Sequence, residues 1–316
     1  MRARPFEPAC HPGLSGARTR SAPVNTGWIA GPAAAGAALF KGLDDAARIE
    51  ARAAAYLADP GHVEALLAPL IEALAADPWF EPPLKVSRDP LRTGVVLFDC
   101  PAVAISATVT RAAELNRLAA PATVVLSGRV TLTRYIRGGE ARMRRWRADP
   151  VDAEFNAATA APAREIAPHI LKDGMMLRQD GRTTGHLLTG ATHDLVALTA
   201  TIKAGAAPLT REYAIADGTL VRAVCADDAA SRIEMLLTFL RVCGRSDAGA
   251  LFDDGSRHPA FHLRWAAMRE WLMLDARAAR DRLADMRTSD ANAEIRAAAA
   301  ATLSALDRRL EQPCPA

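Results

Sequence analysis

The stretch Glu294-Ile295-Arg296-Ala297-Ala298-Ala299 near the carboxyl end decides how this part of the chain folds, because an earlier stretch follows the same pattern. A single offset of 32 positions relates five pairs of residues: Leu263 and Ile295, Arg264 and Arg296, Ala267 and Ala299, Trp271 and Leu303, and Leu274 and Leu306. A helical unit of this kind cannot bury its apolar stripe alone. The offset therefore predicts two stacked copies of one helical unit, an arrangement that commonly exposes a binding surface.

The stretch at 294–299 resembles the signature of HEAT repeats, in which an acidic residue, a branched apolar residue and an arginine precede alanines. In the earlier unit His262 replaces the acidic residue, whereas Pro259 and the Leu263-Arg264 pair fit the pattern. The resemblance implies a HEAT-like, armadillo-type helical domain over residues 227–311 that is used for protein contact. Fold alone does not assign a function.

Composition places the chain among ordinary globular proteins. It has 316 residues, of which half are hydrophobic and 24% are charged, so there is enough chain for two domains with sizeable cores. The net charge is only +3, from 39 basic and 36 acidic side chains. Neither nucleic acid nor an anionic membrane is therefore expected as a partner.

Cysteine usage and hydropathy predict a location. The five cysteines are scattered and form no C-x-x-C pair, which is typical of isolated thiols in a reducing compartment. A short apolar stretch at 28–40 follows Arg18 and Arg20, so a secretory signal peptide is the alternative. With the abundance of arginine and alanine, which suggests a GC-rich genome, we predict a bacterial cytoplasmic protein.

The amino-terminal residues divide into two segments. Residues 1–31 are rich in Arg, Pro, Gly and Ala without hydrophobic periodicity, which predicts a disordered arm. Residues 32–80 have the apolar spacing of two helices, at 33–58 and 62–76, separated by Asp59-Pro60-Gly61. We expect these two helices to form an antiparallel hairpin.

The central segment, 81–226, has the pattern of short strands separated by turns. This predicts an antiparallel β barrel or sandwich and, with the helical ends, an α+β protein. A doubly wound fold is disfavoured because few helical segments alternate with the strands. Pairs such as Asp180-Gly181 and Asp217-Gly218 are typical of hairpin turns. The clearest strand-like runs are 94–98, 103–109, 122–126, 130–136, 141–147, 175–178, 193–202, 209–215 and 220–225.

The turns of this segment resemble those of cupins. Gly138-Gly139 follows the run at 130–136, and Lys172-Asp173-Gly174-Met175 precedes the turn at Asp180-Gly181. Metal-dependent cupins carry a His-x-His with a following Glu and a later His, and this set is missing from the sequence. The resemblance therefore implies a metal-free member that senses a ligand or acts as a structural module. We expect neither a metal nor a cofactor.

The leading functional hypothesis is a non-catalytic protein-interaction module with an unidentified partner, whose β domain could hold a small ligand that tunes the contact. Arginine and tryptophan dominate binding hot spots. The candidate contact residues are Arg264, Trp265, Arg269 and Trp271, although the helical spacing also allows the two tryptophans to be core residues.

The alternative hypothesis is a small-molecule or metal-dependent enzyme with its active site inside the β domain. The sequence has no G-x-S-x-G elbow and no P-loop that would identify the reaction. Under this hypothesis polar side chains converge on one cavity, and the candidates are Arg178, His186, His193 and Glu212.

Overall fold

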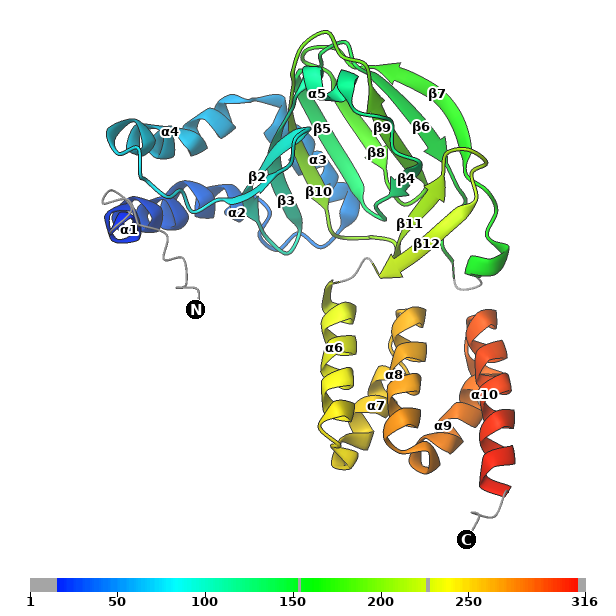
Figure 1. The fold of residues 1–316 in the computed structure, drawn as a ribbon. Helices are drawn as coiled ribbons and strands as arrows, with labels where there is room; N and C mark the ends of the chain where they lie inside the picture. Colours follow the sequence, from blue (N-terminus) through cyan, green and yellow to red (C-terminus); the bar gives the residue numbers. More distant parts are fainter. Residues whose placement is uncertain (1–15, 153–154, 226–227, 312–316) are drawn as a thin grey trace, which may run out of the picture.

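The computed structural model describes residues 16–152, 155–225 and 228–311, which form three consecutive parts (Figure 1). Helices occupy the amino-terminal part, strands the middle and helices the carboxyl-terminal part. Among the helices of these ranges, none combines the length and the apolar character that a membrane span requires.

The amino-terminal part begins with a helix that the sequence did not indicate. Helix α1 spans Ala17–Trp28 and continues through a π-helical turn at Ile29–Ala33 into α2, Ala34–Ala38. The indole Nε1 of Trp28 donates a 2.7 Å hydrogen bond to the Leu66 carbonyl, and the Trp28 side chain is buried. The prediction of disorder is therefore wrong from residue 16 onward, because a tertiary contact anchors the helix. Residues 1–15 lie outside the described ranges.

The next two helices serve different neighbours. Helix α3, Ala46–Ala58, packs against strands β5 and β10, whereas α4, Gly61–Ala76, packs against α1. The helix expected at 33–58 is interrupted at 39–45, where Gly42 has φ +72°. Asp45 restarts the helix by accepting a hydrogen bond from the Arg48 amide. The expected simple hairpin is thus replaced by one helix on the sheet and one on α1.

The strands form two layers. The order in the largest sheet is β1-β2-β3-β10-β5-β8, and the smaller sheets are β12-β11-β4 and β7-β6-β9. Strands β4 and β9 contact each other, so the two small sheets together face the large one (Figure 1). All pairings between described strands are antiparallel, and they close no barrel, so of the two expected forms the sandwich is the one found. The bounds are β1 Lys85–Arg88, β2 Arg92–Asp99, β3 Val103–Thr110, β4 Thr123–Leu126, β5 Val130–Arg137, β6 Arg142–Arg147, β7 Arg164–Ile170, β8 Met176–Asp180, β9 Thr184–Thr189, β10 Leu195–Ile202, β11 Leu209–Ala214 and β12 Leu220–Cys225.

In the central segment three strands and one helix were not expected from the sequence: β1, β7, β9 and α5, Ala112–Arg117. Strand β7 is largely exposed and contains Pro168, which weakens a strand signal. The turn at Asp217-Gly218 joins β11 to β12 in the expected hairpin. At Asp180-Gly181 the chain instead crosses between layers, because β8 pairs with β5 and β9 with β6.

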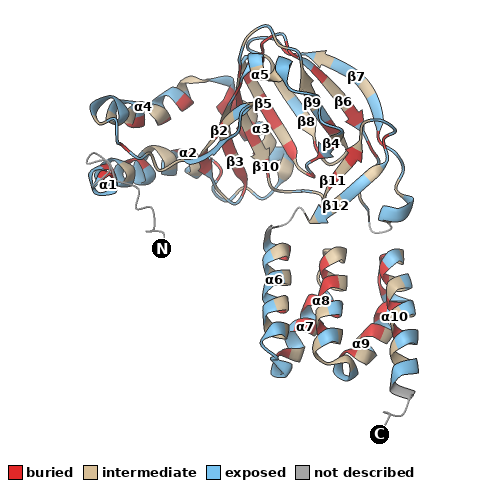
Figure 2. Ribbon diagram, viewed as in Figure 1, coloured by how far each residue is buried: buried red, intermediate tan, exposed pale blue. Residues whose placement is uncertain are grey.

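The two faces of the large sheet differ in chemistry. One face packs on α3 and forms a buried apolar core that includes Ile49, Leu57, Ile105, Leu132 and Leu198 (Figure 2). Because successive side chains of a strand point to opposite faces, the residues between these apolar positions face the second layer. That inner face carries hydroxyl groups.

The carboxyl-terminal part is a two-layer stack of helices. Its elements are α6 Asp228–Val242, α7 Gly249–Gly255, α8 Phe261–Leu274, α9 Ala276–Ser289 and α10 Ala293–Glu311. Helices α6, α8 and α10 lie side by side, with α7 and α9 alternating between them in the second layer (Figure 1). A separate apolar core, centred on Phe252, Met268, Leu283 and Met286, holds the stack together.

The two helical units repeat a specific contact. Nη1 of Arg264 donates to the carbonyls of His258 and Pro259, at 3.2 and 3.1 Å. Nη1 of Arg296 donates to the carbonyls of Asp290 and Ala291, at 2.6 and 3.0 Å. The two donor arginines are 32 positions apart, and each acceptor of the first unit is 32 positions from the matching acceptor of the second, which is the offset found in the sequence. The repeat is therefore present in the contacts as well as in the pattern.

An ion pair joins one unit to the next. The Asp290 carboxylate accepts hydrogen bonds from Nε and Nη2 of Arg264, at 2.8 and 2.6 Å. Only 1% of the Asp290 side chain and 12% of the Arg264 side chain are exposed. Burial alone would raise the pKa of Asp290, but the hydrogen bonds from Arg264 and from the Asn292 amide hold that pKa below its usual range.

Phe155 connects the β domain to the helical stack. Its carbonyl accepts a 3.0 Å hydrogen bond from Asn292, and its ring lies 6.5 Å from that of Phe261. On the β side, the guanidinium of Arg211 lies over the Phe155 ring at 5.8 Å. A single side chain thus contacts both parts.

Candidate functional site

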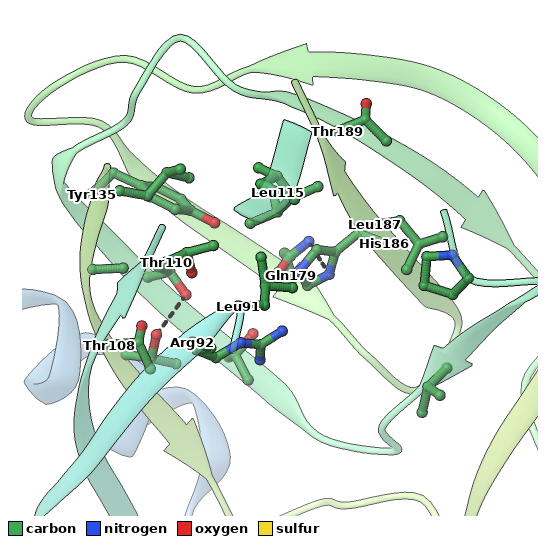
Figure 3. Close-up of a pocket in the computed structure, with 18 of the residues that line it drawn as sticks. Leu91, Arg92, Thr108, Thr110, Leu115, Tyr135, Gln179, His186, Leu187 and Thr189 are labelled. Atoms are coloured by element: carbon green, nitrogen blue, oxygen red, sulfur yellow. Dashed lines mark hydrogen bonds between the residues drawn. The ribbon is translucent and has the colours of Figure 1, made fainter. Parts of the chain in front are cut away.

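A cavity of about 890 Å³ lies between the two layers of the sandwich (Figure 3). Strands β2, β3, β5, β8 and β10 form one wall, and β4 and β9 form the other. Helix α5 and the segment 118–121 line the remaining side. This volume is within the range of small-molecule sites.

Hydroxyl groups cover the large-sheet wall. Thr133 of β5 and Thr199 of β10 are paired across the strands, and their Oγ1 atoms are 3.1 Å apart. Ser106 of β3 is the partner of Thr199 on the other side and lies within 3.5 Å of the Thr199 carbonyl. The other hydroxyl-bearing residues of this wall are Thr108, Thr110, Thr131 and Tyr135.

His186 and Gln179 face each other inside the cavity (Figure 3). Gln179 Nε2 is 3.0 Å from Nδ1 of His186, so the amide donates and Nδ1 accepts. In the neutral ring the proton then resides on Nε2, which becomes a donor. Burial, and next the positive charges of Arg92 and Arg145, lower the pKa of His186 to about 4. His186 is an exposed residue, but its accessible surface lies in the cavity between the two layers. Its exposure is therefore compatible with a pKa that is lowered by the surrounding protein.

Arg92 supplies the positive charge of the cavity. It pairs with Thr110 in the register of β2 and β3, which places it on the inner face. Within the described ranges its guanidinium forms no ion pair, and no Asp or Glu lines the cavity. Burial raises the pKa of the Tyr135 hydroxyl, partly offset by the charge of Arg92, so this hydroxyl stays protonated and able to donate.

The residues available do not form a candidate metal centre. In the part of the chain that the structure describes, no three His, Cys, Asp or Glu side chains gather where they could hold an ion. His186 is the single imidazole that lines the cavity among these residues. The groups that the lining does present are hydrogen-bonding side chains and one guanidinium.

The four candidates for an active site do not converge. His186 lines the cavity, but Arg178 faces α3 and forms a 2.7 Å ion pair with Glu50. His193 lies 3.7 Å from Asp173, away from the cavity lining. Glu212 is bound by Arg222 at 2.6 Å and by the Thr123 hydroxyl at 2.5 Å. The convergence that the enzyme hypothesis requires is absent for these four side chains.

The four candidates for a protein contact occupy different environments. Arg264 forms the ion pair to Asp290, and Trp271 is 8% exposed within the helical core. Trp265 packs partly buried against the same core, whereas Arg269 is exposed. A role in partner binding remains a prediction for all four, and Arg264 and Trp271 have clear structural roles.

Sequence reasoning missed Arg92, Tyr135 and Gln179. A signal was present in residues 103–110, which read Val-Ala-Ile-Ser-Ala-Thr-Val-Thr, with hydroxyls at every second position from Ser106. Residues 130–137 have the same alternation, with Thr131, Thr133 and Tyr135 on one face. Hydroxyls along one face of two adjacent strands indicate a polar inner wall.

No known family and no curated protein matches the chain. Among solved structures, similarity is found to the 7S globulin of Momordica charantia, at 13% identity and TM-score 0.26, over 42% of this chain and 35% of that one. Ectoine synthase from P. lautus is 13% identical with TM-score 0.22, over 38% and 71%. A cupin-superfamily sugar phosphate isomerase from Silicibacter pomeroyi is 10% identical with TM-score 0.24, over 41% and 73%. Scores this low carry no argument.

Proposed function

We propose that the protein is a non-catalytic ligand-binding protein, in which a metal-free, cupin-like sandwich holds a small molecule and a HEAT-like helical domain contacts a protein. The cavity of about 890 Å³ carries the proposal. Its lining combines apolar side chains with many hydroxyl groups and the polar side chains of Arg92, Gln179 and His186, so it offers both burial and hydrogen bonds to a small molecule.

Binding is favoured over catalysis by the state of His186. A general base works best when its pKa is near the operating pH. With a pKa of about 4, the His186 ring is neutral at pH 7 and a weak base, although its Nε2–H remains a good donor. No carboxylate or thiol lines the described cavity to act in its place.

The surface of the helical domain supports protein contact. The terminal unit of a helical stack normally presents a polar outer face. Helix α6 instead exposes a row of large apolar side chains: Met235, Leu236, Phe239 and Val242. We propose that a second copy of this chain covers this row, because an apolar row related to itself by a two-fold axis is self-complementary.

A cavity-blocking variant tests the ligand-binding function. Native mass spectrometry and thermal shift with a diverse small-molecule library are applied to the full chain and to Thr108→Trp, which places an indole in the cavity. Val109→Trp is the matched control, because Val109 is 40% exposed and lies on the opposite face of the same strand. Ligands should stabilise the wild type and Val109→Trp but not Thr108→Trp. Equal stabilisation of all three, or of none, would refute the proposal.

A further inference from the structure

We infer that the ligand is a small organic carboxylate, with its carboxylate bound between the Arg92 guanidinium and Nε2–H of His186 and its apolar body against the leucines of the cavity. This inference rests on the proposed function and specifies its ligand class. The groups concerned lie together: Arg92, Gln179 and His186 are directed into the same part of the cavity (Figure 3).

The charge of the lining selects an anion. Arg92 contributes a full positive charge, and among the described lining residues no carboxylate balances it. Arg92, His186 and Tyr135 all line this cavity (Figure 3). Arg92 is exposed, so solvent partly screens its charge, but no carboxylate of the described lining competes with an anion for it. A cationic ligand would be repelled.

The hydrogen-bonding groups also match a carboxylate. Nδ1 of His186 is occupied by Gln179, so the ring offers its donor, Nε2–H, to a ligand. The guanidinium of Arg92 offers further donors in a fixed planar arrangement. A carboxylate accepts only and has two oxygens, and arginine binds such groups with charge-assisted hydrogen bonds. Arg92 and His186 are therefore complementary to one carboxylate.

The remaining lining defines the body of the ligand. Leu115 of α5, Leu187 of β9 and Leu195 of β10 border the cavity, and Val125 adds a further apolar surface. These side chains come from both layers and enclose the space beyond the charged group. A hydrocarbon chain or an aromatic ring can lie against these apolar side chains, beside the hydroxyl groups of the large-sheet wall.

Matched ligand pairs test the inference. Octanoate and octanamide, and benzoate and benzamide, are titrated into the full chain by calorimetry at pH 7. The acid of at least one pair should bind about tenfold more tightly than its amide, since charge-assisted hydrogen bonds are roughly twice as strong as neutral ones. Arg92→Gln should remove that preference, whereas Arg88→Gln, at an exposed residue outside the cavity, should preserve it. Bound carboxylate should also raise the NMR-measured pKa of His186.

The outcomes separate the two levels of the proposal. If the amides bind as tightly as the acids, or if Arg92→Gln keeps the preference, the carboxylate inference fails while ligand binding stands. If ammonium ligands such as octylamine bind more tightly than octanoate, the inference fails in sign. If neither these probes nor the diverse library bind, the inference and the proposed function fail together.

Discussion

Replacement of Asp290 by Asn should loosen the helical domain. The substitution keeps the size of the side chain but removes its charge, and it places an amide NH2 against the N–H groups of Arg264. The Arg264 side chain, 12% exposed, is then a buried cation without its counter-ion. Removal of one partner of a buried ion pair costs about 3–5 kcal/mol. Because Arg264 keeps its two carbonyl acceptors, we expect a cost near the lower end, about 3 kcal/mol.

Hydrogen exchange followed by mass spectrometry measures this effect locally, which suits a chain whose separate cores need not unfold as one. Peptides from α8, α9 and α10 should exchange faster in Asp290→Asn, and peptides from the β domain should not change. Asp281→Asn is the control, because the Asp281 side chain on α9 is fully exposed. A change in α8–α10 below about 1 kcal/mol, or one equal to that of the control, would show that the pair does not join the units.

Acid provides a second reading of the same contact. The pKa of Asp290 is lowered in the folded state, so its contribution to stability is complete above the pKa of the unfolded chain, near 3.8, and is lost as pH falls through the folded value. Protection of α8–α10 should therefore decline more steeply in acid for the wild type than for Asp290→Asn.

Three further predictions concern other sites. His186 should titrate near pH 4 in NMR, and a measured pKa near 6.5 would place the ring in bulk water. Because its pKa in the unfolded chain is about 6.5, the contribution of the neutral ring to stability is complete above pH 6.5 and declines as the pH falls toward 4. His186→Gln should remove this decline. Gly185→Ala should destabilise the sandwich by about 1–3 kcal/mol in urea unfolding, because a Cβ there would meet the Val125 carbonyl at 2.7 Å, and an unchanged midpoint would show that β9 can shift freely. Phe239→Glu should lower self-association in light scattering without lowering the melting temperature, since the side chain is 64% exposed. Met273→Glu is the control, because Met273 is an exposed apolar residue of α8 outside the row, and equal molar mass for both variants and the wild type would contradict the proposed contact between copies.

Much of the architecture follows from local pattern. The nine expected runs each coincide with a strand because β-type residues and turn signals alternate along that segment. The 32-residue offset likewise survives as a repeated contact, because Arg264 and Arg296 each reach carbonyls five and six residues before them. Interactions within one unit join residues that are close in the sequence, so pattern analysis can detect them.

Features that depend on distant neighbours were missed. Helix α1 contains Pro23 and little apolar periodicity, and its position depends on the bond from Trp28 to Leu66, 38 residues away. The cavity has the same origin, since Arg92 and His186 come from strands in different sheets. The spacing of residues in the sequence does not predict contacts between such distant strands. The alternating hydroxyl groups of β3 and β5 did indicate one wall of the cavity.

The repeated arginine contact gives the helical stack a property that the sandwich lacks: its length can change in whole steps. A tandem copy of residues 259–290, placed after Asp290, would keep the carbonyls five and six residues before the copied arginine and would bring the aspartate that pairs with that arginine. Gene duplication could therefore extend the stack by 32 residues at a time without redesigning a core, whereas an added strand would disturb the pairing of the whole sheet. Extension of the helical stack and preservation of the cavity are thus separate problems for evolution or design.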